Sequence, residues 1–351
     1  MPYALPLARL RRRAAVVLSV VAVGLVSACG GSDDGGATGS GGGAEAQPSG
    51  SAAAGAFPVS IPHALGTTTI EEQPERVVTL GWGSQDVALA LGVVPVGMPK
   101  FTYGGNAQGI LPWNEDKLAG QAPTLLDESD GVPFEAVAAL QPDVILATYS
   151  GIQQADYDRL AQIAPTVAYP ETPWLTSWQE QTTLVGAALG KSTEAQQLVA
   201  ETEQAIAKAG TDNPVLAGKS FTYGNAAGPG AISAYVTGDP RVTLLTGMGM
   251  EPAPGIETLK PGSGQFYADV SIEQADTLDS DVLVMWYGSE DVQKQVEAQK
   301  LFQELPAVQR GSYVALTDQS FVFATSAVSV LSIPWSLDTF VPQLVEAAEK
   351  A

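Results

Sequence analysis

The sequence contains almost none of the side chains that build disulfides and transition-metal sites. Its 351 residues include one cysteine, Cys29, and one histidine, His63. A single cysteine cannot form a disulfide within the chain, and zinc sites generally need several converging Cys or His ligands. The composition therefore excludes a disulfide-stabilised scaffold and argues against direct binding of bare zinc or manganese. We interpret His63 as a structural residue of a β-hairpin around Gly66.

Positive charge is also scarce. The chain has 17 Lys and Arg against 38 Asp and Glu, which gives a formal net charge of −21. Four of the arginines lie in the first 28 residues, and without them the charge falls from −21 to −25. A body this acidic repels phosphate backbones, so we expect no nucleic-acid partner.

The usual sequence motifs of enzymes are missing. The chain has no G-x-S-x-G elbow, no phosphate-binding G-x-x-x-x-G-K-[ST] loop and no Cys–His pair. The remaining catalytic chemistry is hydrolysis by paired carboxylates, as in glycosidases. Since no pattern places two such carboxylates together, the sequence predicts a protein that is not an enzyme, with a carboxylate-based hydrolase as a remote alternative.

The N-terminus has the pattern of an export signal. Residues 9–29 read RLRRRAAVVLSVVAVGLVSAC, with basic residues first, then an apolar run, then small residues. This run is short for a membrane span and typical of a secretory signal. Its end, VSAC, resembles a lipobox, which predicts a signal peptide over 1–28 and lipidation of Cys29. An ordinary signal with an incidental cysteine is the alternative.

Residues 29–56 are rich in Gly, Ser and Ala. Such a tract cannot bury enough apolar surface to fold, so it is predicted to be a flexible tether that spans about 25–30 Å on average. The sequence thus predicts an extracytoplasmic protein that a lipid anchor holds at the cell membrane.

The rest of the chain alternates short apolar strands with helices. Val77–Leu80 is a predicted buried strand, followed by a turn, a helix from Asp86 to Leu91 and a second strand at Val93–Val96. Strands of this kind in a β-loop-α-β order indicate a parallel sheet covered by helices on both faces. Because the pattern restarts near residue 219, the predicted fold class is α/β with two Rossmann-like lobes.

One short pattern occurs twice. Residues 134–150 read FEAVAALQPDVILATYS and residues 272–288 read IEQADTLDSDVLVMWYG. Each copy predicts a short helix, a buried strand and an aromatic residue at the strand's end, so each is assigned to one lobe. The identical pairs at this offset include Glu135 and Glu273, Leu140 and Leu278, Asp143 and Asp281, Val144 and Val282, and Tyr149 and Tyr287.

The stretch between the copies predicts how the lobes are joined. In 174–190, Leu175, Trp178, Thr182, Val185 and Leu189 recur at helical spacing on one face. We therefore expect an N-terminal lobe at 57–173, one long bridging helix at 174–190 and a C-terminal lobe at 191–351. A cleft between two lobes is the default site for a small molecule.

Five phrases in order resemble a known family. PERVVTLGWGSQDVALALGVVPVG, FEAVAALQPDVILATYSG, YDRLAQIAPTV, WQEQTTLVGAALG and FQELPAVQRGSYVAL resemble the iron–siderophore (FecB/FhuD-like) periplasmic-binding family, the substrate-binding lipoproteins of ABC importers. The likeness covers about residues 57–345. It implies two Rossmann-like lobes joined by one long helix, a ferric siderophore held in a shallow cleft between them, little hinge motion, no cofactor, and ABC permease subunits as partners of a monomer.

The resemblance also assigns a role to the repeated glutamates. Glu135 and Glu273 match the first-turn glutamates that project toward the permease in that family. An acid in the first turn also stabilises a helix by about 0.3–1 kcal/mol through the helix dipole. The two roles are compatible.

Residues in the loops at the strand ends are expected to contact the ligand. Any single aromatic among them could instead be a core residue, and the alternative for the arginine is a solvated surface charge. The predicted ligand-binding residues are Trp82, Tyr149, Trp174, Tyr223, Asn225, Arg241, Trp286, Tyr287 and Phe323.

Charge narrows the expected ligand. Catecholate-binding relatives present several arginines to an anionic ferric complex, whereas only Arg241 matches here. A tris-catecholate of about −3 needs compensating donors in a partly desolvated site. We therefore favour a neutral or cationic hydroxamate complex of the ferrioxamine type, with mixed carboxylate siderophores next. Haem or cobalamin is the alternative, since Tyr149 or Tyr223 could ligate haem iron. A lipoprotein that only adheres to a surface would need no cleft.

Overall fold

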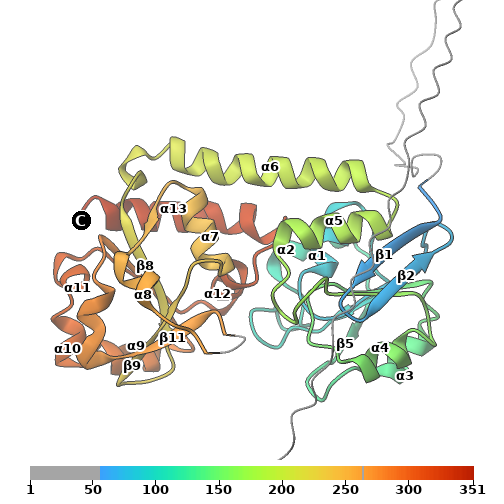
Figure 1. The fold of residues 1–351 in the computed structure, drawn as a ribbon, viewed down its shortest axis with the longest axis horizontal. Coiled ribbons are helices and arrows are strands. Elements are labelled where there is room, and N and C mark those ends of the chain that lie inside the picture. The colour runs from blue at the N-terminus through green and yellow to red at the C-terminus, as the bar shows by residue number, and fades with distance from the viewer. Residues whose placement is uncertain (1–55, 263–264) are drawn as a thin grey trace, which may run out of the picture. The chain divides into compact units, whose positions relative to one another are not determined.

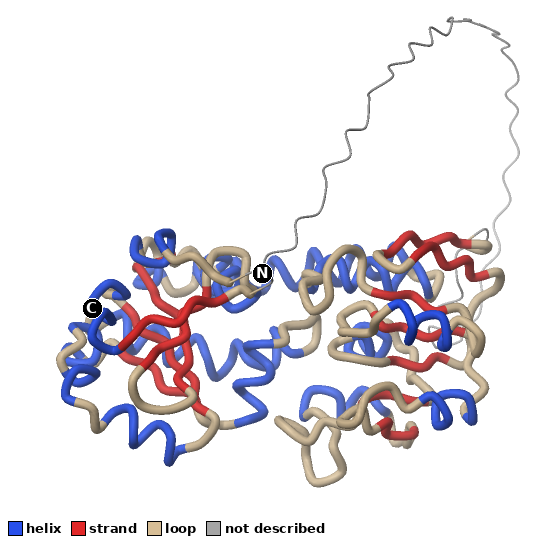
Figure 2. Tube along the Cα trace, turned by 60° about the horizontal axis from the view of Figure 1, so that its bottom comes forward, coloured by secondary structure: helices blue, strands red, loops and turns tan. Residues whose placement is uncertain are grey.

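The computed structural model describes residues 56–262 and 265–351. The predicted signal peptide 1–28, the lipidation site Cys29 and the predicted tether, apart from its last residue, lie outside the described residues. Within the described ranges, no helix combines the length and apolar character needed to cross a membrane. The strands form two large sheets with helices around each, and a separate hairpin (Figures 1 and 2).

The hairpin comes first in the chain. Its strands β1 (Val59–His63) and β2 (Gly66–Ile70) pair antiparallel, with His63 opposite Gly66. The imidazole Nε2 lies 3.0 Å from the hydroxyl of Thr68, and the ring meets Tyr157 edge-on with centroids 5.0 Å apart. His63 is buried, so both the predicted hairpin and the structural position of this histidine are confirmed.

The first lobe contains a five-stranded sheet in the order β5-β4-β3-β6-β7, and all its pairings are parallel. Its strands are β3 (Val77–Thr79), β4 (Gly97–Pro99), β5 (Thr124–Leu126), β6 (Val144–Ala147) and β7 (Thr166–Ala168). Its helices are α1 (Ser84–Ala90), α2 (Pro112–Glu115), the 3-10 turn η1 (Asp116–Leu118), α3 (Phe134–Ala139) and α4 (Gln154–Leu160).

Strand order in this lobe reverses between β3 and β6. The chain first builds β4 and β5 on one side of β3 and then β6 and β7 on the other. Open α/β sheets bind ligands at such a reversal, beyond the carboxyl ends of the strands. The loops after β3 and β6 therefore border the expected crevice. The second predicted strand, 93–96, is wrong in its bounds, since β4 covers Gly97–Pro99, although the N–H of Val96 already donates to the carbonyl of Val77 at 2.8 Å.

The second lobe has a mixed sheet in the order β11-β9-β8-β12-β13, with β10 pairing the start of β8. The β8–β12 and β12–β13 pairs are parallel, whereas β9 and β11 run antiparallel at one edge. The strands are β8 (Ser220–Ala226), β9 (Ala231–Tyr235), β10 (Glu251–Pro252), β11 (Tyr267–Ser271), β12 (Val282–Tyr287) and β13 (Tyr313–Leu316).

Helices surround this second sheet (Figure 2). The 3-10 turn η2 (Pro214–Leu216) precedes β8, and a longer 3-10 segment, η3, covers Ile272–Leu278. The α-helices are α7 (Pro240–Gly247), α8 (Pro254–Thr258), α9 (Glu290–Glu297), α10 (Lys300–Gln303), α11 (Pro306–Arg310), α12 (Gln319–Ser326) and α13 (Ser332–Ala348).

The predicted bridging helix at 174–190 is wrong in its bounds. Helix α5 covers only Trp178–Ala188, because Ser177 is its N-cap and Trp174 has a left-handed φ of 60° that no α-helix accepts. It packs on α1 and β1 of the first lobe. The long helix is the next one, α6 (Ser192–Thr211), about 30 Å in length. It packs against α5 and then against α7 and α13, so α6 joins the lobes (Figure 1).

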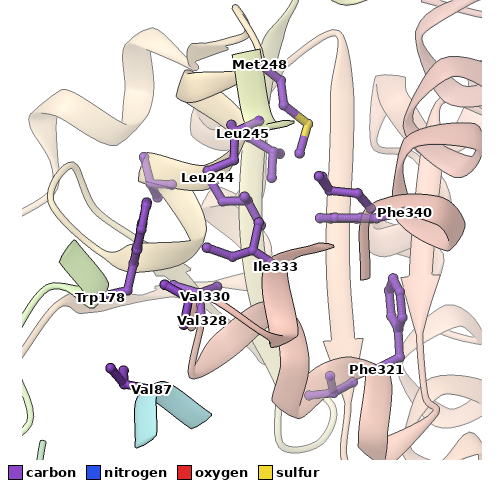
Figure 3. Close-up of a cluster of buried hydrophobic side chains, with 14 of the residues drawn as sticks. Val87, Trp178, Leu244, Leu245, Met248, Phe321, Val328, Val330, Ile333 and Phe340 are labelled. Atoms are coloured by element: carbon purple, nitrogen blue, oxygen red, sulfur yellow. The ribbon is translucent and has the colours of Figure 1, made fainter. Parts of the chain in front are cut away.

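A second connection comes from the segment between α12 and α13. Phe323 and Ala327 pack on Phe101 and Trp113 of the first lobe. Nearby, Val328 and Val330 share one buried cluster with Val87 of α1 and Trp178 of α5 (Figure 3). The two lobes therefore share buried side chains in addition to α6.

A buried carboxylate ties this segment to α1. Asp86 is 1% exposed and accepts hydrogen bonds from Trp113 Nε1 and Asn114 Nδ2, each at 2.8 Å, and from the hydroxyl of Ser329. Desolvation raises the pKa of Asp86, against the effect of these donors. Ser329 in turn accepts the backbone N–H of Ser332, the first residue of α13. Asp86 therefore links α1, through Ser329, to the start of α13.

The repeated pattern corresponds to equivalent structure in the two lobes. Asp143 precedes β6 and accepts the backbone N–H of Arg76, the residue before β3, at 3.0 Å. Asp281 precedes β12 and accepts the backbone N–H of Ser220, at the start of β8, at 2.8 Å. In each lobe a carboxylate thus fastens the beginnings of two neighbouring parallel strands. The aligned helices differ, since α3 is an α-helix and η3 is a 3-10 helix.

Candidate functional site

A pocket of about 370 Å³ lies between the lobes. The first lobe contributes Trp82, Tyr149 and the whole segment 173–179, which ends in the first turn of α5. The second lobe contributes the start of α7 around Arg241, and single residues from elsewhere, including Phe266. The volume is within the range of small-molecule sites, and the position matches the strand-order reversal of the first sheet.

Three aromatic side chains form one wall of the pocket. The ring centroids of Trp82 and Trp174 are 5.0 Å apart, and those of Tyr149 and Trp174 are 5.6 Å apart. Trp82 is 40% exposed and Trp174 is 37% exposed, so neither indole is a core residue. The structure thus brings together three of the residues that the sequence predicted for ligand contact.

The loop after β3 holds Trp82 in a fixed backbone. Gly81 and Gly83 flank it with left-handed φ angles of 72° and 77°. The N–H of Trp82 donates to the carbonyl of Tyr149 at 2.9 Å, and its own carbonyl accepts from Gln181 Nε2 at 2.7 Å. A Cβ at position 81 would lie 2.4 Å from the Tyr149 carbonyl oxygen. Position 81 therefore has to be glycine for the two backbones to approach this closely.

Trp174 is held by the loop after β6. Its N–H donates to the carbonyl of Ser150 at 3.3 Å, and its backbone has the left-handed φ noted above. The indole lies against Gly151, where an added Cβ would be 2.5 Å from Trp174 Nε1. Gly151 thus leaves the space that the indole occupies.

The polar part of the pocket is an ion pair at the start of α7. Asp239 is the N-cap of this helix, and its Oδ1 accepts the backbone N–H of Arg241 at 2.9 Å. Its Oδ2 accepts from Arg241 Nη1 at 2.8 Å. The guanidinium also donates through Nε to Ser326 at 3.1 Å and lies 4.0 Å from the ring centroid of Tyr235. The alternative of Arg241 as a solvated surface charge is wrong, because its side chain is 12% exposed.

Burial affects the ionisation of this pair. Desolvation raises the pKa of Asp239, and the nearby Arg241 opposes the rise. Burial alone would lower the pKa of Arg241, but the Asp239 carboxylate reverses this and the pKa lies above its usual value. The guanidinium is thus held in its charged form next to a counter-ion.

Tyr149 places a hydroxyl in the same pocket from the other lobe. Burial raises its pKa to about 12, so the hydroxyl keeps its proton at neutral pH. It makes no hydrogen bond to any other described residue, and Nη2 of Arg241 makes none either. Free donors from both lobes therefore face a space walled by aromatic rings, which suits a ligand with acceptor oxygens and apolar surface.

Two predicted ligand residues are instead core residues, which corrects the prediction for them. Tyr223 is 1% exposed and lies 3.2 Å from the hydroxyl of Thr325, while Tyr287 is fully buried with its hydroxyl 2.7 Å from that of Tyr313. Neither lines the pocket. Both lie within the central strands β8 and β12, whose side chains pack under the covering helices.

Three further predicted residues lie next to the pocket without lining it. Asn225 and Trp286 both donate to the hydroxyl of Tyr235, at 2.8 Å and 3.0 Å, and Tyr235 underlies Arg241. Phe323 is 8% exposed and packs edge-on against Trp82, with centroids 5.1 Å apart. They support the pocket residues, and direct contact of these three with ligand is not favoured.

Sequence reasoning missed several residues of this site. Asp239 was available in the sequence as an Asp-Pro pair, the usual start of a helix, directly before Arg241. Tyr235 and Ser326 carry no local signal, because their approach to Arg241 depends on the packing of β9 and α12. The pocket segment 173–177 was obscured by the expectation that a helix begins at 174.

The two repeated glutamates are exposed. Glu135 lies in the first turn of α3 and Glu273 in the first turn of η3, and neither makes a hydrogen bond or ion pair with another described residue. In Figure 1, α3 and β11, the strand that leads into η3, both lie on the side away from α6. Permease docking through these glutamates stays a prediction.

Within the described residues, no group of three or more His, Cys, Asp or Glu side chains is placed to hold a metal ion. Trp82, Tyr149, Trp174 and Arg241 therefore remain the predicted residues that the structure assembles around one cavity. Their contact with a ligand stays a prediction.

Comparisons with known proteins agree with this architecture. The chain is 28% identical over 303 residues to the probable siderophore-binding lipoprotein YfiY of Bacillus subtilis, which covers 80% of this chain and 85% of that protein. It is 26% identical over 284 residues to the ferric enterobactin-binding periplasmic protein FepB of Escherichia coli O6:H1, covering 76% and 86%. The crystal structure of Streptococcus pneumoniae TIGR4 PiaA in complex with ferrichrome has a TM-score of 0.75 and 33% identity, covering 83% of this chain and 99% of PiaA. The family model described as periplasmic binding protein matches residues 77–320, well over half of the chain, and the chain therefore belongs to the periplasmic binding protein family.

Proposed function

We propose that this chain is the extracytoplasmic substrate-binding component of an ABC importer and that it captures a ferric siderophore of the hydroxamate type. The observation that carries the proposal is the pocket between the lobes, with exposed indoles on one wall and a neutralised Arg241 on the other. Several relatives are named as siderophore-binding proteins, and PiaA was crystallised with ferrichrome. The protein binds and releases its ligand and carries out no reaction on it.

The hydroxamate class fits the chemistry of the pocket. Three hydroxamates balance the charge of Fe(III), so the complex presents apolar linkers and oxygen acceptors without a large net charge. Trp82 and Trp174 offer flat apolar surface to such linkers, and the hydroxyl of Tyr149 offers a donor to the oxygens. A ferric tris-catecholate is an anion that needs several compensating cations, and Arg241 is already paired with Asp239.

Membrane attachment completes the proposed role. Lipidation of Cys29 would anchor the protein, and the tether 29–56 would let it reach its permease. The names of YfiY and of a second Bacillus subtilis relative, YhfQ, include the word lipoprotein, which supports the lipobox. We propose that the exposed Glu135 and Glu273 dock the monomer on the permease subunits, one from each lobe.

Fluorescence titration tests the ligand class. The indoles of Trp82 and Trp174 line the pocket, so a bound ferric complex should quench tryptophan emission. The panel would be ferrichrome, ferrioxamine B, ferric enterobactin, ferric citrate, hemin and cobalamin. We expect saturable quenching at one site by a hydroxamate complex, with a Kd of about 1 µM or below. Saturable quenching by ferric enterobactin or ferric citrate alone would contradict the hydroxamate assignment. It would still agree with a role as the binding protein of an iron importer.

Haem is the second candidate because Tyr149 places an unpartnered hydroxyl in the pocket. A phenolate can serve as an axial ligand of haem iron. A stoichiometric shift of the Soret band on addition of hemin, abolished by Tyr149→Phe, would favour haem over a siderophore. No such shift is expected, because burial keeps the proton on this hydroxyl at neutral pH.

A further inference from the structure

The ionised side chains that line the pocket cancel each other. Among the described residues that line the pocket, the charged ones are Asp239 and Arg241. They lie 2.8 Å apart through Oδ2 and Nη1. The rest of the wall is aromatic, aliphatic or neutral polar. The site is therefore close to electroneutral although the sequence supplies an arginine at a position that could attract an anion.

Asp239 lines the pocket with a side chain that is itself shielded from solvent. Its side chain is 0% exposed, whereas that of Arg241 is 12% exposed. Its Oδ1 is also fixed by the backbone N–H of Arg241, as the N-cap of α7. The carboxylate is thus a fixed counter-ion behind the guanidinium, held there by the start of the helix and independent of what occupies the pocket.

The guanidinium is oriented as well as neutralised. Nη1 is turned to Asp239 and Nε to the hydroxyl of Ser326, while the plane lies over the ring of Tyr235. Nη2 remains without a hydrogen bond among the described residues. Arg241 therefore offers the pocket N–H donors with little uncompensated positive charge, which suits an acceptor oxygen of a neutral complex better than a multiply charged anion.

We propose that Asp239 is a specificity-determining residue that sets the charge selectivity of the pocket, so that electroneutral and cationic ferric chelates bind in preference to anionic ones. This inference rests on the proposed siderophore-binding function. The acidic surface of the chain acts in the same direction at long range, but salt screens it beyond about 10 Å, whereas the buried pair is screened much less.

The test uses one chelate framework with three charges. Ferrioxamine B has a protonated amine and is cationic, its N-acetyl derivative is neutral, and its N-succinyl derivative is anionic. Wild-type protein should bind the first two more tightly than the third. In Asp239→Asn the amide keeps an N-cap acceptor and a similar volume while the charge is lost. The ratio of anion affinity to cation affinity should rise by about tenfold, which corresponds to about 1.4 kcal/mol.

Two further variants make the outcome independent of one substitution. Arg241→Gln leaves the carboxylate unmatched, so the same ratio should fall below that of wild type. The double variant removes both charges and should return the ratio close to wild type. Glu257→Gln, which removes an exposed charge on α8 away from the pocket, should leave the ratio within about twofold. Thermal unfolding of each variant checks that it is folded.

The outcomes separate this inference from the function on which it rests. If wild type binds none of the three ferrioxamines or ferrichrome, the hydroxamate function itself fails. If wild type binds them and neither Asp239→Asn nor Arg241→Gln changes the ratio by more than about twofold, the pocket reads no charge through this pair and the inference is wrong. Opposite shifts in the two single variants, cancelled in the double variant, would support it.

Discussion

At the scale of single residues, the site depends on small residues that make room for large ones. Gly151 has no positive φ, so its role is to leave space for the indole of Trp174. An added Cβ 2.5 Å from Nε1 would force the indole away from the wall of the pocket. The backbone of Trp174 is itself in the left-handed region, which costs a non-glycine residue free energy.

We therefore expect Gly151→Ala to weaken ligand binding by about tenfold, mainly through faster dissociation. Gly288→Ala is the matched control, since a Cβ there meets nothing within 4 Å and the residue follows β12 in the other lobe. Stopped-flow tryptophan quenching would measure both variants. Equal dissociation rates for Gly151→Ala and wild type would contradict the role of Gly151.

Glu128 gives the site a pH-dependent support. Its carboxylate accepts the N–H of Gly81, next to Trp82, at 3.0 Å, and burial raises its pKa from 4.5 to about 7. The folded protein therefore binds this proton more tightly than the unfolded chain. As pH rises from about 4.5 to about 7, the unfolded state loses the proton first and stability falls.

Glu128→Gln removes this titration and keeps an acceptor for Gly81. Relative to wild type, the variant should gain about 3 kcal/mol of unfolding free energy between pH 4.5 and about pH 8, with little further gain above. Urea unfolding of both proteins at several pH values measures the difference, in which the other titrating groups cancel. A difference that stays constant with pH would exclude a raised pKa for Glu128.

The sequence predicted residues of the site where position along a strand was enough. Trp82 and Tyr149 follow β3 and β6 directly, so their place at the carboxyl edge of the sheet could be inferred. Tyr287 is the last residue of β12, and there the same reasoning failed. The position at a strand's end does not show on which face of the sheet a side chain lies. Tyr287 points into the interior, where its hydroxyl lies 2.7 Å from that of Tyr313.

At the scale of elements, the two copies of the repeated pattern have the same structural role, which is to connect neighbouring parallel strands. Asp143 and Asp281 each fasten the start of one parallel strand to that of its neighbour. The alignment of the copies predicted two similar lobes, and this is the part of the fold that sequence conveyed best. The second copy forms a 3-10 helix where the first forms an α-helix, and this difference was not predictable. The choice between the two helix types depends on tertiary packing, which for η3 is against β9 and β11.

Asp143→Ala and Asp281→Ala should each lower the unfolding free energy by about 1–2 kcal/mol, because each leaves backbone N–H groups without their charged acceptor. Asp279→Ala removes an exposed acid three residues before β12 and should change the unfolding free energy by less than about 0.5 kcal/mol. Chemical denaturation of the three variants would show this. If the two repeated aspartates behaved like Asp279, their equivalence would be only a coincidence of sequence.

The boundary of the bridge shows a limit of periodicity. Apolar spacing over 174–190 fits a helix, and Trp178, Thr182, Val185 and Leu189 are indeed buried. Leu175 continues the spacing but is 48% exposed, because Ser177 caps the helix after it. Spacing alone also gave no reason to prefer this segment over the longer α6 as the connection between lobes.

At the scale of the whole molecule, one exposed glutamate on each lobe is available to a partner. Reversing both charges, with Glu135→Arg and Glu273→Arg together, should abolish siderophore uptake by cells and change ligand affinity by less than about twofold, since neither residue lies at the pocket. Radiolabelled iron uptake and fluorescence titration measure the two quantities.

The control reverses two other exposed acids, Glu72 and Glu257, one in each lobe. It carries the same change in net charge and should leave uptake intact. Uptake that survives in the Glu135 and Glu273 double variant, or that is lost equally in the control, would assign docking to another surface or to overall charge.

The contact between Asp86 and Ser329 has a consequence for how a transporter could recognise cargo. It connects α1 to the beginning of α13 through two buried side chains, and α6 packs on helices of both lobes elsewhere. Two lobes connected in this way can close only slightly around a ligand. The empty and the ligand-bound protein would therefore present nearly the same surface to the permease. The permease would then have to contact the iron complex itself at the opening of the pocket to distinguish the two forms. Ligand-free protein would also compete with ligand-bound protein for the same docking surface.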